Sequence, residues 1–284
     1  LIDHPEFVFI LPLLESIAEA YPQALYYHFR ISTDKDFGVR PVEARLRKLQ
    51  NLLRNDMLDK FVYAMEQLTN PEHRAKAWMS AMNVHYQNAP VLNKLYRAFV
   101  EDCLLVSSDT GDLNRQFASK IPGREVRDRG GEGMPPVDRE LIQRIHKSVN
   151  EVCANFTAIS DKSNTVAHYT KWLDTYSSTL GMKTGEIEIP GLYTGLSKPQ
   201  PESHVKVSSF DKSLLIMTSM RRPKRLKIRG TDEKEYWFLV KGGEDLRQDQ
   251  RVEQLFEICN HLFETDVETS KRNLSVHTYK VIPM

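Results

Sequence analysis

A lysine closes a strongly apolar stretch of this sequence and is followed at once by glycines and carboxylates. The stretch reads FLVKGGEDLRQDQR over residues 238–251, with Lys241 at the end of the apolar part. An ammonium group on a partly apolar strand needs an anion nearby. In nucleotide kinases, a lysine fixed on a strand contacts the ATP phosphates and a carboxylate orients it. The stretch therefore favours a phosphate-binding lysine.

The residues around Lys241 fit that arrangement. Side chains alternate along a strand, so Lys241 shares a face with Trp237 and Leu239. Asp245 is suited to cap a following helix, and Asp249 lies one turn further, where it can reach back toward the strand end. The alternative interpretation is a solvated lysine with surface carboxylates, whose ion pairs contribute less than about 1 kcal/mol.

The loop Ser219–Pro223 lies between two strand-like segments, one strand before the lysine strand. A kinase places the loop that covers the nucleotide phosphates at that position. This loop contains no glycine, so it is neither a protein-kinase glycine-rich loop nor a Walker motif. A hydroxyl such as that of Ser219, together with backbone N–H groups, can still contact a phosphate.

The elements that position these residues change in character along the chain. Apolar residues at helical spacing dominate the first two-thirds, with expected breaks at Pro12, Pro22 and Asn88–Pro90. Helices are expected over 6–30, 42–68, 71–105, 138–158 and 164–180, and a loop over 107–136. The Trp172 and Tyr176 stripe is expected to pack in the core.

Extended segments replace the helices from about residue 185. Strands are expected over 204–210, 214–219, 224–229, 235–241 and near 275–282, with one amphipathic helix between the last two. The expected fold class is therefore α+β, in which helical segments precede an antiparallel sheet with one helix.

Composition excludes several classes of protein. Lys plus Arg total 39 and Asp plus Glu total 38, so the chain has no strong electrostatic bias toward nucleic acid or membrane. Cys103, Cys153 and Cys259 follow no metal or disulfide spacing, which is typical of a reduced, intracellular protein. The apolar run 7–14 is far shorter than the roughly 20 residues that span a bilayer. The chain begins with Leu1, and we interpret it as a piece cut at both ends.

Residues 221–229 hold a dense basic run, RRPKRLKIR. Such a run can be a nuclear address or a nucleic-acid patch. Its alternation, with Leu226 and Ile228 on one face and the cations on the other, favours a half-exposed strand. Both interpretations stay open at this point.

The run FLVKGGEDLRQDQRVEQLF, with SMRRPKR before it and TYKVIPM after it, resembles the N-lobe of the phosphatidylinositol 3-kinase-related protein kinases. IEIPGLY and the helices before it are similar to the end of the helical FAT region and a four-helix FRB insertion of that family. The resemblance implies three parts, which are a FAT-like end over 1–69, an FRB-like insertion over 70–180 and an incomplete kinase N-lobe over 181–284.

The resemblance also implies roles for single residues. Lys241 would contact the ATP phosphates, Asp249 and Glu244 would orient it, and Ser219 would lie in the phosphate loop. The adenine pocket would be lined by Met217, Pro223, Leu239 and Tyr279. The implied activity is that of a serine/threonine protein kinase that uses ATP and Mg²⁺.

No catalytic loop follows Lys241, so the C-lobe is absent and the general base and the Mg²⁺ ligands are expected beyond residue 284. The chain alone is therefore expected to be inactive. By resemblance to the family members that act at DNA ends, the partners would be the Ku heterodimer and DNA ends, with protein Ser/Thr substrates and no membrane. The location would be the nucleus, and the role would be double-strand-break repair by non-homologous end joining. A lipid kinase of the parent family, or a helical scaffold or pseudokinase, stays open as an alternative.

Two further motifs carry less weight. Asp36-Phe37-Gly38 spells the magnesium-binding triplet of kinases, but it precedes Lys241 by about 200 residues, whereas that triplet must follow the lysine. Gly130–Gly133 has no strand before it and is more typical of a loop. The histidines show no ligand spacing, so no metal site is expected at His85, His146, His168, His204 or His277.

Overall fold

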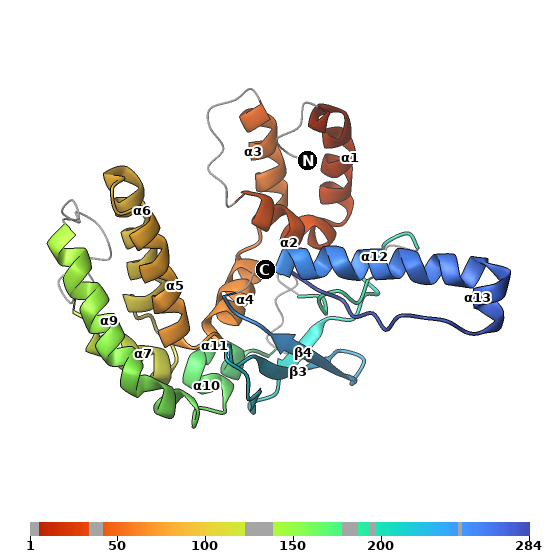
Figure 1. Cartoon of the computed structure of the whole chain (residues 1–284). Helices are drawn as coiled ribbons and strands as arrows, with labels where there is room; N and C mark the ends of the chain where they lie inside the picture. The colour runs from red at the N-terminus through yellow and green to blue at the C-terminus, as the bar shows by residue number, and fades with distance from the viewer. Residues whose placement is uncertain (1–5, 34–41, 123–138, 178–186, 194–196, 244–245) are drawn as a thin grey trace. The chain divides into compact units, whose positions relative to one another are not determined.

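The computed structural model describes residues 6–33, 42–122, 139–177, 187–193, 197–243 and 246–284 (Figure 1). These residues form two compact units. Unit 1 contains the described parts of 1–58, 185–206 and 244–284, and unit 2 those of 59–184 and 207–243. Helices and a four-stranded antiparallel sheet occur together, which confirms the predicted α+β class. The predicted division into three consecutive parts, at residues 69 and 180, stays a prediction. The two units are each built from several segments of the chain and do not test it.

The helices of unit 1 have the following bounds: α1 Phe7–Ala20, α2 Pro22–Thr33, α3 Val42–Leu53, α12 Leu246–Thr265 and α13 Val267–Lys271. Phe7, Leu11 and Leu49 are buried in a core between α1 and α3. Pro22 starts α2 as predicted, but the predicted break at Pro12 is wrong because α1 continues through it. Pro12 is exposed, so α1 tolerates its missing N–H while the opposite side buries Phe7 and Leu11.

The end of the chain packs on α12 through side chains. The Asn260 side chain accepts a hydrogen bond from the Val276 N–H (2.7 Å) and donates one to the Val276 carbonyl (2.8 Å). The Tyr279 N–H donates to Glu253 Oε2 (3.1 Å). The predicted strand near 275–282 is therefore wrong. This segment forms no strand, and its backbone groups bond side chains of α12 instead.

The helices of unit 2 have the following bounds: α4 Asp56–Gln67, α5 Pro71–Val84, α6 Ala89–Phe99, a π-helix Val100–Leu104, α7 Asp112–Lys120, α9 Arg139–Ser160, α10 Val166–Tyr169 and α11 Lys171–Thr175. Helix α5 lies against both α6 and α9 (Figure 1). The predicted loop over 107–136 is wrong for α7, where Leu113 and Phe117 are buried one turn apart. The predicted helix 164–180 is interrupted at Thr170, whose backbone is extended.

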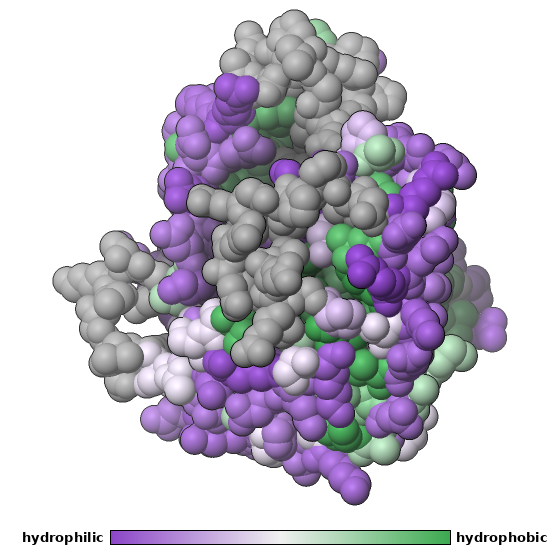
Figure 2. Space-filling view, turned by 90° about the vertical axis from the view of Figure 1, so that its left-hand side faces the viewer, coloured by the Kyte–Doolittle hydropathy of each residue, from purple (hydrophilic) through white to green (hydrophobic). Residues whose placement is uncertain are grey.

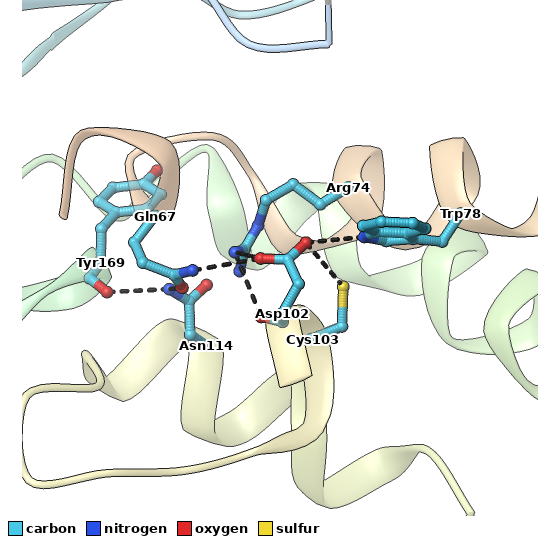
Figure 3. A network of polar contacts seen from close by, with 7 residues as sticks. All are labelled: Gln67, Arg74, Trp78, Asp102, Cys103, Asn114 and Tyr169. Atoms are coloured by element: carbon cyan, nitrogen blue, oxygen red, sulfur yellow. Dashed lines mark hydrogen bonds and ion pairs between the residues drawn. The ribbon is translucent and has the colours of Figure 1, made fainter. Parts of the chain in front are cut away.

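A buried polar network joins these helices (Figure 3). Asp102, in the π-helix, accepts hydrogen bonds from Arg74 Nη1 (2.5 Å) and Trp78 Nε1 (2.8 Å). Gln67 Nε2 donates to the same carboxylate (3.3 Å), and Asn114 Nδ2 donates both to Gln67 (3.0 Å) and to a backbone carbonyl of α10 (2.8 Å). Because a buried polar group is costly unless it is paired, this network fixes the relative register of α4, α5, α7 and α10.

The sheet of unit 2 contains β1 Val207–Phe210, β2 Leu215–Ile216, β3 Lys224–Gly230 and β4 Glu235–Val240. All the pairings are antiparallel. Strands β1 and β2 follow each other along one edge of β3, and β4 pairs with the other edge. Four of the five predicted strands are thus confirmed.

Strand β3 separates two faces. Leu226 and Ile228 are fully buried on one face, whereas Arg225 and Arg229 are exposed on the other. The half-exposed strand predicted for the basic run is confirmed. On β1, Phe210 stacks on Phe61 of α4 at 5.9 Å between ring centroids and also contacts Trp172, as predicted for that aromatic stripe.

None of the described helices is long and apolar enough to cross a membrane. Hydrophilic residues cover much of the described surface in the view of Figure 2, with smaller apolar areas between them. This distribution fits the 27% of charged residues in the sequence.

Phe61→Ala should lower the free energy of unfolding by about 3–5 kcal/mol, because it leaves a cavity where α4 packs on the sheet. Urea unfolding followed by circular dichroism measures the change. Phe9→Ala is the matched control, since Phe9 is 83% exposed, and it should change stability by less than about 0.5 kcal/mol. Equal effects of the two substitutions would contradict the packing described here.

Candidate functional site

The hairpin loop and the lysine strand lie side by side in unit 2. Lys224 pairs with Val240 across β3 and β4, so Pro223 and Lys241 come next in the same register. A Cβ added to Gly243 would lie 3.1 Å from Arg221 Nη1, which places the loop against the end of the lysine strand. The structure therefore brings together the two segments that were predicted to contact phosphates.

The hairpin loop has a defined backbone. The Met217 N–H donates to the Pro223 carbonyl (2.9 Å), and the Arg222 N–H donates to the Ser219 carbonyl (3.0 Å). Arg222 has a φ of 49°, in the left-handed region that non-glycine residues seldom adopt. Its guanidinium is paired with Asp161, 2.6 Å away at the end of α9. Backbone hydrogen bonds within the loop and the ion pair with Asp161 therefore anchor it.

The exposed face of the sheet combines apolar and cationic groups. Met217 and Leu239, two residues predicted to line an adenine pocket, are 40% and 50% exposed. Arg225 lies over the Trp237 ring, with its Cζ 4.1 Å from the centroid, and Lys227 Nζ lies 5.3 Å from it. Such a face offers apolar surface to a base and positive charge to phosphates.

Lys227 on this face is held by two carboxylates. Its Nζ lies 3.1 Å from both Asp211 and Glu235. Hydrogen bonds from Ser213 hold the pKa of the Asp211 carboxyl at about 2, with a smaller contribution from Lys227. Lys227 is thus committed to structural ion pairs, whereas Lys241 is the lysine at the strand end beside the loop.

Directly behind the loop, a lysine is buried. Lys224 is 2% exposed and shares the apolar face of β3 with Leu226 and Ile228. Its Nζ donates to Asn70 Oδ1 (2.6 Å) and to the Arg222 carbonyl (3.4 Å). It also lies 4.6 Å from the centroid of the Tyr169 ring. The ammonium thus exchanges water for three fixed partners.

The charge that balances Lys224 lies on the far side of Asn70. Asn70 Nδ2 donates to Glu72 Oε1 (3.1 Å), and Ser160 Oγ donates to Glu72 Oε2 (3.0 Å). Glu72 is only 1% exposed. Burial lowers the pKa of the Lys224 ammonium to about 7, Glu72 opposes that shift, and nearby arginines add to it.

Sequence reasoning missed Asn70, Glu72 and Lys224 as a connected group. The sequence contained one signal. Lys224 falls on the same face of the alternating strand as Leu226 and Ile228, and a buried lysine requires partners. The partners themselves lie about 150 residues earlier in the chain, and no local pattern connects them to β3.

The residue after Lys241 also touches the turn between α4 and α5. A Cβ added to Gly242 would lie 1.8 Å from Thr69 Oγ1 and 2.5 Å from Thr69 Cγ2. Real Cβ contacts are never that short, so only glycine allows this approach. Thr69 and Asn70 therefore lie against both predicted phosphate-binding segments.

The remaining predicted site residues belong to unit 1 or lie outside the described residues. Asp249 is in the first turn of α12 and half-buried, and Tyr279 is 60% exposed in the segment that follows α13. Glu244 and Asp245 lie outside the described residues. The pairing of Asp249 with Lys241 and the adenine contact of Tyr279 therefore stay predictions.

The weaker motifs add nothing to the site. Both Asp36–Gly38 and Gly130–Gly133 lie outside the described residues. Within the part of the chain that the structure describes, no group of three or more His, Cys, Asp or Glu side chains could hold a metal ion. His204 Nδ1 instead contacts Glu188 at 3.0 Å, and His168 Nδ1 contacts the Thr165 hydroxyl at 2.8 Å.

Residues 235–284 match the family model of phosphatidylinositol 3- and 4-kinases. Over its whole length the chain is 38% identical to the DNA-dependent protein kinase catalytic subunit of Dictyostelium discoideum and covers 7% of that protein. Over 99 residues the chain is also 46% identical to the serine/threonine-protein kinase tor1 of Schizosaccharomyces pombe. This match covers 35% of the chain and 4% of tor1.

Among solved structures, a chain of a complete CtTel1 dimer with C2 symmetry matches 99% of this chain over 8% of its own length. The identity is 19% and the TM-score is 0.44. The resemblance to the phosphatidylinositol 3-kinase-related protein kinases is confirmed by the sequence matches. The chain spans only about 7% of the length of its first curated relatives.

Gly242→Ala should destabilise the strand end by roughly 1–3 kcal/mol, because the added methyl group overlaps the Thr69 side chain. Thr69→Gly in the same chain removes the overlapping atoms and should restore part of the loss. Thermal unfolding of the single and double variants measures this. Additive losses in the double variant would contradict the contact.

Lys224→Met should change how stability depends on pH. The pKa of Lys224 is about 7 in the folded state against 10.5 for a free lysine, so the unfolded chain binds more protons between these values. The stability of the wild type relative to the variant should therefore rise with pH across that window, by at most about 1.4 kcal/mol per pH unit. Urea unfolding at several pH values measures the difference, and a constant difference would contradict burial of the ammonium.

Proposed function

We propose that this chain is the nucleotide-binding portion of a serine/threonine protein kinase related to the phosphatidylinositol 3-kinases. One observation carries the proposal. The hairpin loop lies beside the end of β4 that leads into Lys241, and both β4 and Lys241 lie within residues 235–284, which match the kinase family model. A loop and a strand lysine in this arrangement are what an ATP site requires.

In this proposal each residue has a role. The Lys241 ammonium contacts the ATP phosphates, and the Ser219 hydroxyl and the loop backbone bind them from the hairpin. By the family resemblance, Asp249 and Glu244 would orient Lys241. The same resemblance implies that Met217, Pro223, Leu239 and Tyr279 would line the adenine pocket.

In such a reaction an acceptor hydroxyl would attack the γ-phosphorus of ATP in line and ADP would leave, and a bound Mg²⁺ would supply positive charge to the phosphates. The described residues fit the nucleotide, since they offer an exposed apolar face beside fixed cations. By the family resemblance, the Mg²⁺ ligands and the general base would lie beyond residue 284. The contribution of this chain is to bind and orient the phosphates.

The wider role follows from the relatives by analogy. The whole-chain matches carry the name DNA-dependent protein kinase catalytic subunit. We propose a nuclear enzyme that acts on protein serine and threonine residues in double-strand-break repair by non-homologous end joining, with DNA ends and the Ku heterodimer as partners. A lipid kinase is the second candidate, because the matching family model describes phosphatidylinositol kinases.

Lys241→Met in the full-length protein should lower phosphotransfer by roughly 10²–10³-fold, because one preorganised charge on the phosphates is lost. Transfer of labelled phosphate to a serine-containing peptide and to phosphatidylinositol measures the rate and separates the two kinase classes. Lys234→Met is the matched control, since Lys234 lies in the β3–β4 turn and is exposed. Unchanged transfer in the Lys241 variant would contradict the proposal.

A further inference from the structure

The turn between α4 and α5 contacts both segments of the proposed phosphate site. We propose that this turn, Thr69–Asn70, positions the ATP-phosphate elements: Asn70 holds the hairpin loop through Lys224, and Thr69 fixes the end of the lysine strand at Gly242. This inference rests on the proposed function, and it makes Asn70 a positioning residue that acts through Lys224 and does not touch the nucleotide.

The conformation of Asn70 is the first observation that supports this. Asn70 is the N-cap of α5 and precedes Pro71, the position where an asparagine side chain normally bonds the first amides of a helix. Here the side chain makes no such bond, although the equivalent residue of α6, Asn88, does cap its helix by accepting from the Val91 N–H. The Asn70 amide is used for long-range contacts instead.

Those contacts place the amide between two buried charges. Its NH₂ group donates to the Glu72 carboxylate, and its oxygen accepts from the Lys224 ammonium. The amide dipole is thus aligned favourably with both charges, because its positive end meets the anion and its negative end meets the cation. Tyr169 adds a donor to the same oxygen at 3.4 Å. The site of the ammonium is therefore fixed by the helical part of unit 2.

Lys224 transmits that position to the loop because it is the residue next to Pro223. Its Nζ also bonds the Arg222 carbonyl, inside the loop itself. Arg222 is in turn paired with Asp161 at the end of α9. Two helical segments of unit 2 therefore hold the loop at positions on either side of Pro223. Asn70 holds Lys224 through a buried hydrogen bond, and Asp161 holds Arg222 through a half-buried ion pair.

Thr69 provides the second contact, at the other phosphate element. Its side chain fills the space beside Gly242, directly after Lys241. Because Thr69 and Asn70 are consecutive, a shift of this turn displaces the loop and the strand end together. The distance between the two groups that meet the phosphates is thereby kept constant.

This arrangement predicts a selective defect. Loss of the Asn70 amide leaves the Lys224 ammonium without its shortest contact, so the loop moves while the apolar face of the sheet keeps its packing. Affinity for ATP should then fall and affinity for adenosine should not. A general loss of folding would lower the affinities for ATP and adenosine to the same extent.

The experiment compares Asn70→Ala with the matched control Asn88→Ala in the full-length protein. Competition against a fluorescent ATP analogue gives the dissociation constants of ATP and adenosine. Asn70→Ala should raise the dissociation constant of ATP by about tenfold to a hundredfold, because the loop loses a hydrogen bond to a charged group, and should leave that of adenosine unchanged. Asn88→Ala should change neither ligand. The double variant Asn70→Ala/Lys224→Met should lose no more affinity for ATP than Lys224→Met alone, because Asn70 acts through that lysine.

Three results would overturn the inference. They are unchanged ATP affinity in Asn70→Ala, equal losses for ATP and adenosine, and additive losses in the double variant. Lys241→Met measured in the same assay separates this failure from that of the proposed function. If Lys241→Met lowers the affinity for ATP while Asn70→Ala does not, only the positioning role of Asn70 is wrong.

Discussion

The burial of one ammonium group governs how the sheet of unit 2 is placed on its helices. Lys224 lies on the apolar side of β3, where an unpaired charge would cost several kcal/mol. It is tolerated because Asn70, Tyr169 and a loop carbonyl surround it and Glu72 supplies the opposite charge. Apolar packing alone could be satisfied by several nearby positions of a sheet, whereas directional contacts to a buried cation permit few. Because the hairpin loop is next to Lys224 in the chain, these contacts also determine the position of the loop.

The same strand explains why the opposite face is free for a ligand. Alternation assigns Leu226 and Ile228 to the helices and Arg225 to the outer face, beside Trp237 and Leu239 of β4. The outer face therefore combines apolar surface with fixed charge. The Asp102 network of Figure 3 holds the supporting helices in register, and Tyr169 belongs to both polar groups. The proposed site thus rests on helices that are joined by buried polar contacts.

The sequence predicted what depends on local patterns. Period-two alternation identified β3 and its faces, and the turn signals placed the hairpin and the start of α5 at Pro71. Local patterns failed where packing decides. Pro12 is accommodated inside α1 because the core holds that helix, α7 forms in a charged region because Leu113 and Phe117 are buried, and the backbone near 275–282 bonds side chains of α12. The contact of Lys224 with Asn70 joins residues 154 positions apart, so no window of sequence could contain it.

The most direct test of the account is to find which lysine lies beside the ATP phosphates. An acyl phosphate of ATP transfers its acyl group to a lysine amine held near the phosphates and releases ATP, and mass spectrometry of peptides then identifies the modified residue. The account predicts acylation of Lys241, suppressed by excess ATP, with Lys224 unmodified behind the loop. Acylation of Lys224 or Lys227 in place of Lys241, or labelling of Lys241 that ATP does not suppress, would contradict it.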